Sequence, residues 1–190
     1  VNAQDSQLPA TIQYIETYAP LAIKEMARTG FPASIKIAQG ILETDAGRSE
    51  LVQKSNNHFG LKCKSSWTGE KVYHNDDEQG ECFRRYADAN ESYLDHSDYL
   101  KSQTRYAFLF NYDPNDYDSW ANGLKKAGYA TSPIYAQTLI KNIEKYNLNA
   151  LNSIKEDSDS SSLADYFYAL ENNMIVQPTA IMDRSNNKAD

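Results

Sequence analysis

The spacing of apolar residues predicts that most of this chain is helical. Between residues 32 and 47 apolar side chains recur every three or four positions, which indicates a helix with one apolar stripe. Pro32 suits the first helical position, and Gly47 is expected to end the helix in a left-handed conformation. Gln39 and Glu43 are four residues apart, so they share one face at the edge of the stripe. A carboxyl group is therefore expected near the end of a well-anchored helix.

Further helices are predicted on both sides of this one. Residues 9–29 have helical spacing, with Pro20 expected to kink or divide the helix and Gly30 to end it. The spacing of Asp88 and Glu91 is that of a capping box, which predicts a helix from residue 88. Other helical segments are expected at 49–54, at 105–110, at 117–127 behind an Asp116 cap, and from 132 onward.

Residues 56–87 lack this spacing and predict a small antiparallel β-lobe. NNHFGLKC and ECFRRY are short runs typical of strands, and two glycine-bearing turns lie between them. A hairpin or a three-stranded lobe would place Asp76, Asp77 and Glu78 at a strand end or at the hairpin tip. The predicted fold class is mainly α (α+β): a helical domain, a small antiparallel β-lobe and a cleft between them.

Composition and charge narrow the classes of function. The net charge is −7, and residues 151–190 carry much of it with 3 basic and 7 acidic residues. The chain has no block of basic residues that would indicate binding to nucleic acid or to an anionic membrane surface. It also has no apolar run long enough for a membrane span. The polar start of the chain, without an initiator methionine, fits a processed protein exported to the periplasm or secreted. The 14 tyrosines suit a wide, wet groove that binds sugars, although most are expected in contacts between helices.

The domain organisation follows from a change in composition after residue 152. We expect a main domain at 9–152, an acidic, serine-rich linker at 153–162, and a tail at 163–190 with one helix. Cys63 and Cys82 are too few for a zinc site, and the three histidines form no metal-binding pattern, so neither a metal nor a cofactor is expected. A disulfide between Cys63 and Cys82 would add roughly 3 kcal/mol of stability, and two reduced thiols are the alternative.

Paired carboxylates are the chemistry that this arrangement suggests. Glycoside hydrolysis uses one carboxyl group to protonate the leaving oxygen and a second to activate water or to stabilise the transition state. Glu43 is the candidate acid, because partial shelter by apolar neighbours raises a carboxyl pKa. The second group must come from Asp76, Asp77, Glu78 or Glu81, and spacing does not choose among them. The alternative is a solvated acidic turn and an ordinary surface glutamate.

Five segments, in this order, resemble the glucosaminidase domain of glycoside hydrolase family 73: PASIKIAQGILETDAGRSEL, NNHFGLK, GECFRRY, ESYLDHSDYL and AGYATSPIYAQTLIKNIEKYNL. That family contains bacterial peptidoglycan endo-β-N-acetylglucosaminidases, including hydrolases associated with the flagellar rod. The resemblance covers roughly residues 10–150. It implies a lysozyme-like helical fold with a small β-lobe. It also implies cleavage of the β-1,4 bond after N-acetylglucosamine in peptidoglycan.

The resemblance also implies roles for individual residues. It places the general acid on Glu43, in ILET where the family typically has ILES. Asn57 and Phe59 match an N-x-F-G segment that is expected to shape the cleft floor and to hold an N-acetyl group. Tyr129, in GYAT, matches a family tyrosine beside the cleft, and packing is the alternative role for it and for Tyr135. The residues expected to bind substrate are Gln39, Asn57, Phe59, Tyr129 and Tyr135.

This chain departs from the family pattern at the second carboxylate. Many relatives have a glutamate before the hairpin turn, and counting back from Gly80 gives Asp76, whose side chain is one methylene shorter. Asp76 is therefore predicted as the second catalytic residue, with Asp77 and Glu78 in reserve. The departure leaves inverting, retaining and substrate-assisted mechanisms open.

The predicted function is that of a monomeric endo-β-N-acetylglucosaminidase that cleaves the glycan strands of peptidoglycan without a cofactor. The first alternative is an N-acetylmuramidase or a lytic transglycosylase, which would cleave the alternate linkage. The second is a catalytically inactive module that binds peptidoglycan.

Overall fold

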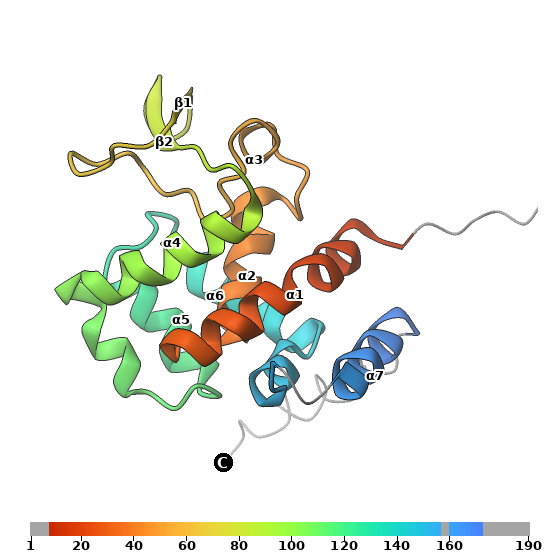
Figure 1. The fold of residues 1–190 in the computed structure, drawn as a ribbon. Coiled ribbons are helices and arrows are strands. Elements are labelled where there is room, and N and C mark those ends of the chain that lie inside the picture. The colour runs from red at the N-terminus through yellow and green to blue at the C-terminus, as the bar shows by residue number, and fades with distance from the viewer. Residues whose placement is uncertain (1–7, 157–159, 173–190) are drawn as a thin grey trace, which may run out of the picture.

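The computed structural model of this protein packs helices around a central helix, with a small hairpin at one edge (Figure 1). It describes residues 8–156 and 160–172. The α-helices are α1 (Ala10–Thr29), α2 (Ala33–Thr44), α3 (Glu50–Ser55), α4 (Ala89–Ser102), α5 (Tyr117–Lys126), α6 (Tyr135–Lys145) and α7 (Ser160–Glu171). The other elements are the 3-10 helices η1 (Thr104–Asn111) and η2 (Leu148–Ser153) and the strands β1 (Lys71–His74) and β2 (Glu81–Arg84). The predicted fold class, mainly helical with a small antiparallel lobe, is confirmed.

Helix α2 lies at the centre of the core, in contact with α1, α5, α6 and η2. It is buried along its whole length except at Leu42 and Glu43 in its last turn. Gly40 allows α1 to approach closely, because a Cβ atom at this position would lie 2.2 Å from the hydroxyl oxygen of Tyr14. The helix therefore leaves the core only where it carries its single carboxyl group.

Lys36 is a fully buried cation within α2, and α4 satisfies its ammonium group. Its Nζ atom contacts three acceptors of α4: the backbone oxygen of Tyr93 at 2.8 Å, Nδ1 of His96 at 2.9 Å and Oγ of Ser97 at 2.6 Å. Desolvation lowers the pKa of Lys36 to about 7. These contacts tie the central helix to α4.

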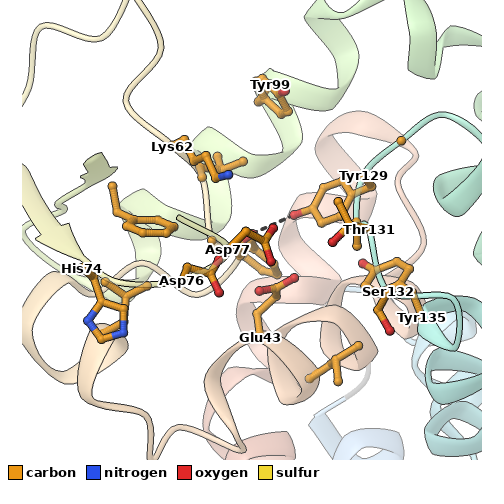
Figure 2. Close-up of a pocket in the computed structure, with 18 of the residues that line it drawn as sticks. Glu43, Lys62, His74, Asp76, Asp77, Tyr99, Tyr129, Thr131, Ser132 and Tyr135 are labelled. Atoms are coloured by element: carbon orange, nitrogen blue, oxygen red, sulfur yellow. Dashed lines mark hydrogen bonds between the residues drawn. The ribbon is translucent and has the colours of Figure 1, made fainter. Parts of the chain in front are cut away.

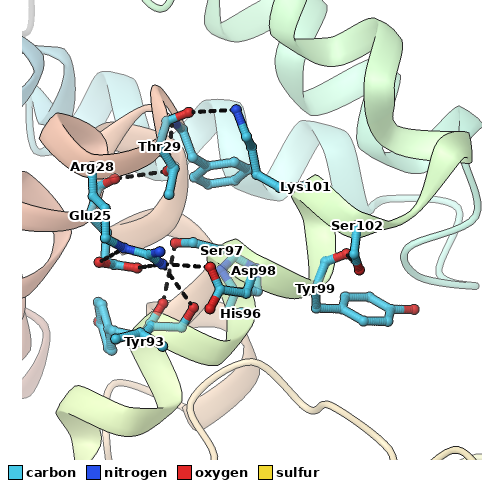
Figure 3. A network of polar contacts seen from close by, with 12 residues as sticks. Glu25, Arg28, Thr29, Tyr93, His96, Ser97, Asp98, Tyr99, Lys101 and Ser102 are labelled. Atoms are coloured by element: carbon cyan, nitrogen blue, oxygen red, sulfur yellow. Dashed lines mark hydrogen bonds and ion pairs between the residues drawn. The ribbon is translucent and has the colours of Figure 1, made fainter. Parts of the chain in front are cut away.

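A second set of polar contacts ties α1 to α4 (Figure 3). Arg28 of α1 pairs with Glu25 at 2.7 Å on the same helix and with Asp98 of α4 at 2.8 Å. Because the Glu25 side chain is almost fully buried, it requires this partner. Both polar sets therefore fix α4 against the two N-terminal helices.

The β-lobe is an antiparallel hairpin in which Lys71 pairs with Arg84 and His74 with Glu81. The connection between β1 and β2 carries three acidic residues at the hairpin tip, as predicted: Asp76, Asp77 and Glu78.

The segment before the hairpin joins the lobe through one bridge and one disulfide. The strand expected from NNHFGLKC is reduced to an isolated bridge between Lys62 and Phe83. Cys63 and Cys82 are bonded, with their Cα atoms 5.5 Å apart. The disulfide fixes the segment that follows α3 to β2, and so to the base of the acidic connection.

Two predictions for the N-terminal helices, an end of the second helix at Gly47 and a division of the first at Pro20, are wrong. Helix α2 ends at Thr44, because Asp45 adopts the left-handed conformation (φ 48°) two residues before Gly47. Pro20 does not divide α1, which continues through it. Pro20 lies on the exposed side of the helix, where the carbonyl that loses its backbone partner can be hydrated.

Helix α7 packs on α1, and its side chains extend the same hydrophobic core. Tyr166 and Leu170 are buried, and the Tyr166 hydroxyl donates to the backbone oxygen of Tyr146 at 2.7 Å. The helix begins within the predicted linker, whose residues 157–159 lie outside the described residues, as do residues 173–190 of the predicted tail. Within the described ranges, no helix combines the length and apolar character that a membrane span requires.

Docking of α7 is expected to depend on pH through Glu16. Desolvation, and then the nearby Glu171 of α7, raise the pKa of Glu16 to about 7. A raised carboxyl pKa stabilises the folded state below the unfolded value of about 4.5, and this contribution is lost as the pH rises through about 7. We expect Glu16→Gln to raise the melting temperature by roughly 1–2 °C at pH 8 and to leave it unchanged at pH 5. Glu156→Gln is the control, and equal shifts at both pH values would contradict the assignment.

Candidate active site

A cavity of about 580 Å³ opens between the last turn of α2, the β-lobe and the segment that leads into α6. Leu42 and Glu43, the two residues of α2 that are not buried, both line it. Figure 2 shows the Glu43 side chain directed toward Asp76 and Asp77 of the lobe. The expectation that a helix carboxyl group and lobe carboxyl groups face one cleft is confirmed.

The Glu43 carboxyl group is open to the cleft but lies among protein atoms on its other sides. Desolvation by these walls is the main reason that its pKa is raised to about 7, and the negative charges of Asp76 and Asp77 raise it further. Gly60 makes room for the carboxyl group, because a Cβ atom there would lie 3.0 Å from Oε2 of Glu43. Glu43 can therefore carry or release a proton near neutral pH.

The hairpin connection presents two of its three acids to the cleft. Asp76 and Asp77 line the cavity, whereas Glu78 does not. The Asn75 side chain accepts a hydrogen bond from the backbone of Gly80 at 2.7 Å, and the backbone N–H of Asp76 donates to the oxygen of Glu78 at 3.0 Å. These bonds hold the connection in the turn that directs the first two acids inward.

The fourth candidate acid, Glu81, is committed to an ion pair. Its carboxylate accepts from Lys62 at 2.7 Å, and Lys62 itself lines the cleft. The Glu81 hydrogen bond is the main reason that the pKa of Lys62 is raised, and the charges of Asp77 and Asp76 add to it. Among the described residues, no group of histidine, cysteine, aspartate and glutamate side chains is arranged to hold a metal ion.

Aromatic residues form the opposite wall. The Tyr129 hydroxyl donates to the backbone oxygen of Phe59 at 2.9 Å, and its ring stacks on that of Tyr135 with centroids 5.9 Å apart. All three residues line the cavity, although Phe59 and Tyr135 are each only about 2% exposed, and Figure 2 shows the two tyrosines on the side opposite Asp76. Gln39 does not line it, and instead donates from Nε2 to the Tyr135 hydroxyl at 2.9 Å. Because the Tyr135 hydroxyl oxygen accepts this hydrogen bond from Gln39, the hydroxyl proton can be donated to another neighbouring group.

The structure does not bring Asn57 to the cleft surface. Its Nδ2 atom donates to the backbone oxygens of Leu61 and Arg84, both at 2.9 Å, and its Oδ1 atom accepts from Leu61 N at 3.1 Å. With its side chain buried and fully bonded, Asn57 shapes the segment that presents Phe59 and Gly60. The expected contact between its amide and a substrate has no support in this geometry.

Several cleft residues were not predicted, although most lie within the segments that carried the family resemblance. His74 precedes the acidic connection on β1, and Tyr99 belongs to ESYLDHSDYL. The segment AGYATSPIY contributes further polar groups, of which two are labelled in Figure 2: Thr131 and Ser132. The signal that could have identified them is their position beside predicted site residues.

Comparison of the sequence with protein-family models finds a match to the glucosaminidase family over residues 19–148, described as mannosyl-glycoprotein endo-beta-N-acetylglucosaminidase. Peptidoglycan hydrolase FlgJ of Vibrio cholerae is 32% identical over 159 residues, which are 76% of this chain and 47% of that protein. Exo-glucosaminidase LytG of Bacillus subtilis is 35% identical over 142 residues, 68% of this chain and 49% of that protein. The chain thus spans about half the length of these curated relatives.

Solved structures show the same fold. The glycoside hydrolase domain of FlgJ from Salmonella typhimurium superposes with a TM-score of 0.61 at 25% identity, covering 86% of this chain and 98% of that one. The catalytic domain of the autolysin Auto from Listeria monocytogenes gives a TM-score of 0.65 at 26% identity, covering 78% and 91%. The lysozyme-like architecture expected from the resemblance is therefore confirmed.

The contact between Gly60 and Glu43 predicts a position-specific cost of adding a methyl group. Gly60→Ala introduces a side chain at φ +67° and also places it against the Glu43 carboxyl group. Gly30→Ala is the matched control, because Gly30 has φ +81° and a Cβ atom added there would meet nothing within 4 Å. We expect Gly60→Ala to lose about 1 kcal/mol more free energy of unfolding than the control in urea denaturation. Equal losses would show that the carboxyl group is not packed against Gly60.

Proposed function

This chain belongs to the glucosaminidase family, and from that premise we propose that it hydrolyses the glycan strands of peptidoglycan. The observation that carries the proposal is a single carboxyl group with a pKa of about 7, Glu43, which faces the acids of the lobe across a cleft. At neutral pH a large fraction of Glu43 is protonated and can donate to the glycosidic oxygen as the bond breaks.

Asp76 is the carboxylate that we assign as the partner of Glu43. It lines the cleft, and among the charges that raise the Glu43 pKa it has the largest effect. In this role it stabilises the positive charge that develops on the sugar, or positions the group that attacks it. Asp77 also faces the cleft and is the alternative candidate for this role. Glu78 is no longer a candidate, because it does not line the cavity.

The aromatic wall supports a sugar ligand. Tyr129 offers ring surface, Tyr135 and Phe59 support it from behind with only about 2% of each exposed, and the Tyr135 hydroxyl offers a donor that Gln39 orients. We propose that this wall holds an N-acetylglucosamine unit beside Glu43, so that cleavage leaves this sugar at the new reducing end. In this arrangement Gln39 acts through Tyr135, without touching the substrate itself.

Cleavage within the strand, rather than from its end, is the mode that we propose. A second cavity of about 570 Å³ shares Lys64, Tyr99 and Arg105 with the cleft, so the groove continues past the catalytic carboxyl groups. A continuous groove accommodates sugars on both sides of the cut bond. LytG, the relative described as an exo-glucosaminidase, represents the alternative mode.

The proposed place of action is the cell wall, outside the cytoplasm. Relatives are described as peptidoglycan hydrolases, and that polymer lies outside the cytoplasmic membrane. The Cys63–Cys82 disulfide supports this location, because such bonds persist in oxidising compartments.

Replacement of Glu43 tests the proposed chemistry. Glu43→Gln keeps the size and polarity of the side chain but removes its titrating proton, so clearance of a peptidoglycan suspension should fall by about 10²-fold or more. Wild-type activity should decline as the pH rises above about 7, where Glu43 loses its proton. Glu50→Gln, an exposed position on α3, is the control and should clear the suspension at the wild-type rate.

Mass spectrometry of the released fragments decides between the related activities. New reducing ends of N-acetylglucosamine support the proposal, whereas N-acetylmuramic acid or anhydro ends would support an N-acetylmuramidase or a lytic transglycosylase. Binding to insoluble peptidoglycan with no clearance by the wild-type protein would support the inactive binding module.

A further inference from the structure

The groove beyond the catalytic carboxyl groups ends in a second cavity with its own polar lining. It is lined by residues of α4, by the start of η1 and by the segment around Lys64. Lys64, Tyr99 and Arg105 line both cavities and so mark their junction. Figure 2 shows Tyr99 at the edge of the cleft remote from Glu43. The junction is therefore a place that a bound glycan strand could reach with a side branch.

The junction carries positive charge that no neighbouring acid neutralises. Two acids line the second cavity, but Asp95 is paired with Arg84 at 2.8 Å and Asp98 with Arg28 at 2.8 Å. Among the described residues, neither of the two other cations at the cavity, Lys64 and Arg105, forms an ion pair with a carboxylate. Two cations thus face the groove without a partner of opposite charge.

Arg105 is held in place for binding. Its Nη2 atom donates to the Tyr99 hydroxyl at 2.9 Å, its Nη1 atom reaches the backbone oxygen of Ala127 at 3.4 Å, and its guanidinium group lies 4.6 Å from the centre of the Tyr106 ring. None of these contacts neutralises its charge. A planar guanidinium group that is already oriented loses less conformational entropy when it binds a carboxylate.

We propose that Lys64 and Arg105 form a binding site for a carboxylate of the peptide branch that peptidoglycan strands carry. The inference rests on the proposed function, because that substrate bears short peptides with free carboxylates on alternate sugars. The site lies where the cleft that holds Glu43 meets the second cavity, so it would bind a branch while the strand itself occupies the cleft. It would make the enzyme prefer strands whose peptides are intact and charged.

A binding measurement tests this site independently of catalysis. The Glu43→Gln protein is mixed with insoluble peptidoglycan that hydrofluoric acid has freed of phosphodiester polymers, and the bound fraction is measured after pelleting. A second sample of the same material has its carboxylates coupled to methylamine, which leaves the peptides in place but removes their negative charge. Activity of the wild-type protein on both materials is followed in parallel.

We expect the Glu43→Gln protein, which is the background for the variants below, to bind the charged material more tightly than the methylamidated material. Adding Lys64→Gln and Arg105→Gln together should weaken binding to the charged material about tenfold and remove the difference between the two. Arg105→Lys, which retains the charge, should keep most of that difference. Lys24→Gln, at an exposed position of α1, is the control for general loss of positive charge.

Equal binding of the two materials by the background protein, or an equal loss on both materials in the double variant, would overturn the site. A parallel sample that is not treated with hydrofluoric acid retains the phosphodiester polymers. A dependence on Lys64 and Arg105 that appears only with that sample would also overturn the site, because the ligand would then be a phosphate. Failure of the wild-type protein to cleave either material would contradict the proposed hydrolysis alone, since binding is measured separately.

Discussion

The enclosure of helix α2 by the rest of the fold is the constraint on which this structure depends. A helix that is buried on all sides can expose a charged group only at an end, and α2 does so at Glu43. Two of its buried polar groups have partners on other elements: the Lys36 ammonium group on α4 and the Gln39 amide nitrogen on Tyr135. Close packing at Gly40 keeps the helix fixed along its axis. The position of the Glu43 carboxyl group, the proposed acid, is thus determined by the hydrophobic core.

The other wall of the site depends on covalent and local constraints, because the lobe is too small to form a core of its own. The disulfide between Cys63 and Cys82 fixes β2 to the segment after α3, and Asn57 ties the same segment to the lobe through backbone groups. The acidic connection is therefore held relative to the cleft floor, and Asp76 faces Glu43. Desolvation from one wall and negative charge from the other act together to raise the same pKa.

Local features of the fold could be predicted from the sequence, and hydrogen-bond partners in distant segments could not. Asp88 and Asp116 cap their helices as expected, since each accepts from a backbone N–H three residues ahead. The left-handed Asp45 gave no signal, because residue type alone rarely indicates this conformation outside glycine. The family resemblance implies a substrate contact for Asn57, and its structural role could not be predicted because one of its partners, Arg84, lies far away in the sequence. Glu43 was predictable because helical spacing placed it at the end of an apolar stripe.

The pKa of Glu43, measured by carbon-13 NMR of its side-chain carboxyl group, tests most directly whether the fold prepares this residue to act as an acid. We expect a value of about 7 in the wild-type protein. We also expect a lower value in the Asp76→Asn, Asp77→Asn double variant, because two negative charges are removed while the desolvating walls remain. A wild-type pKa near the ordinary value of 4.5 would contradict the claim that the fold keeps this group protonated near neutral pH.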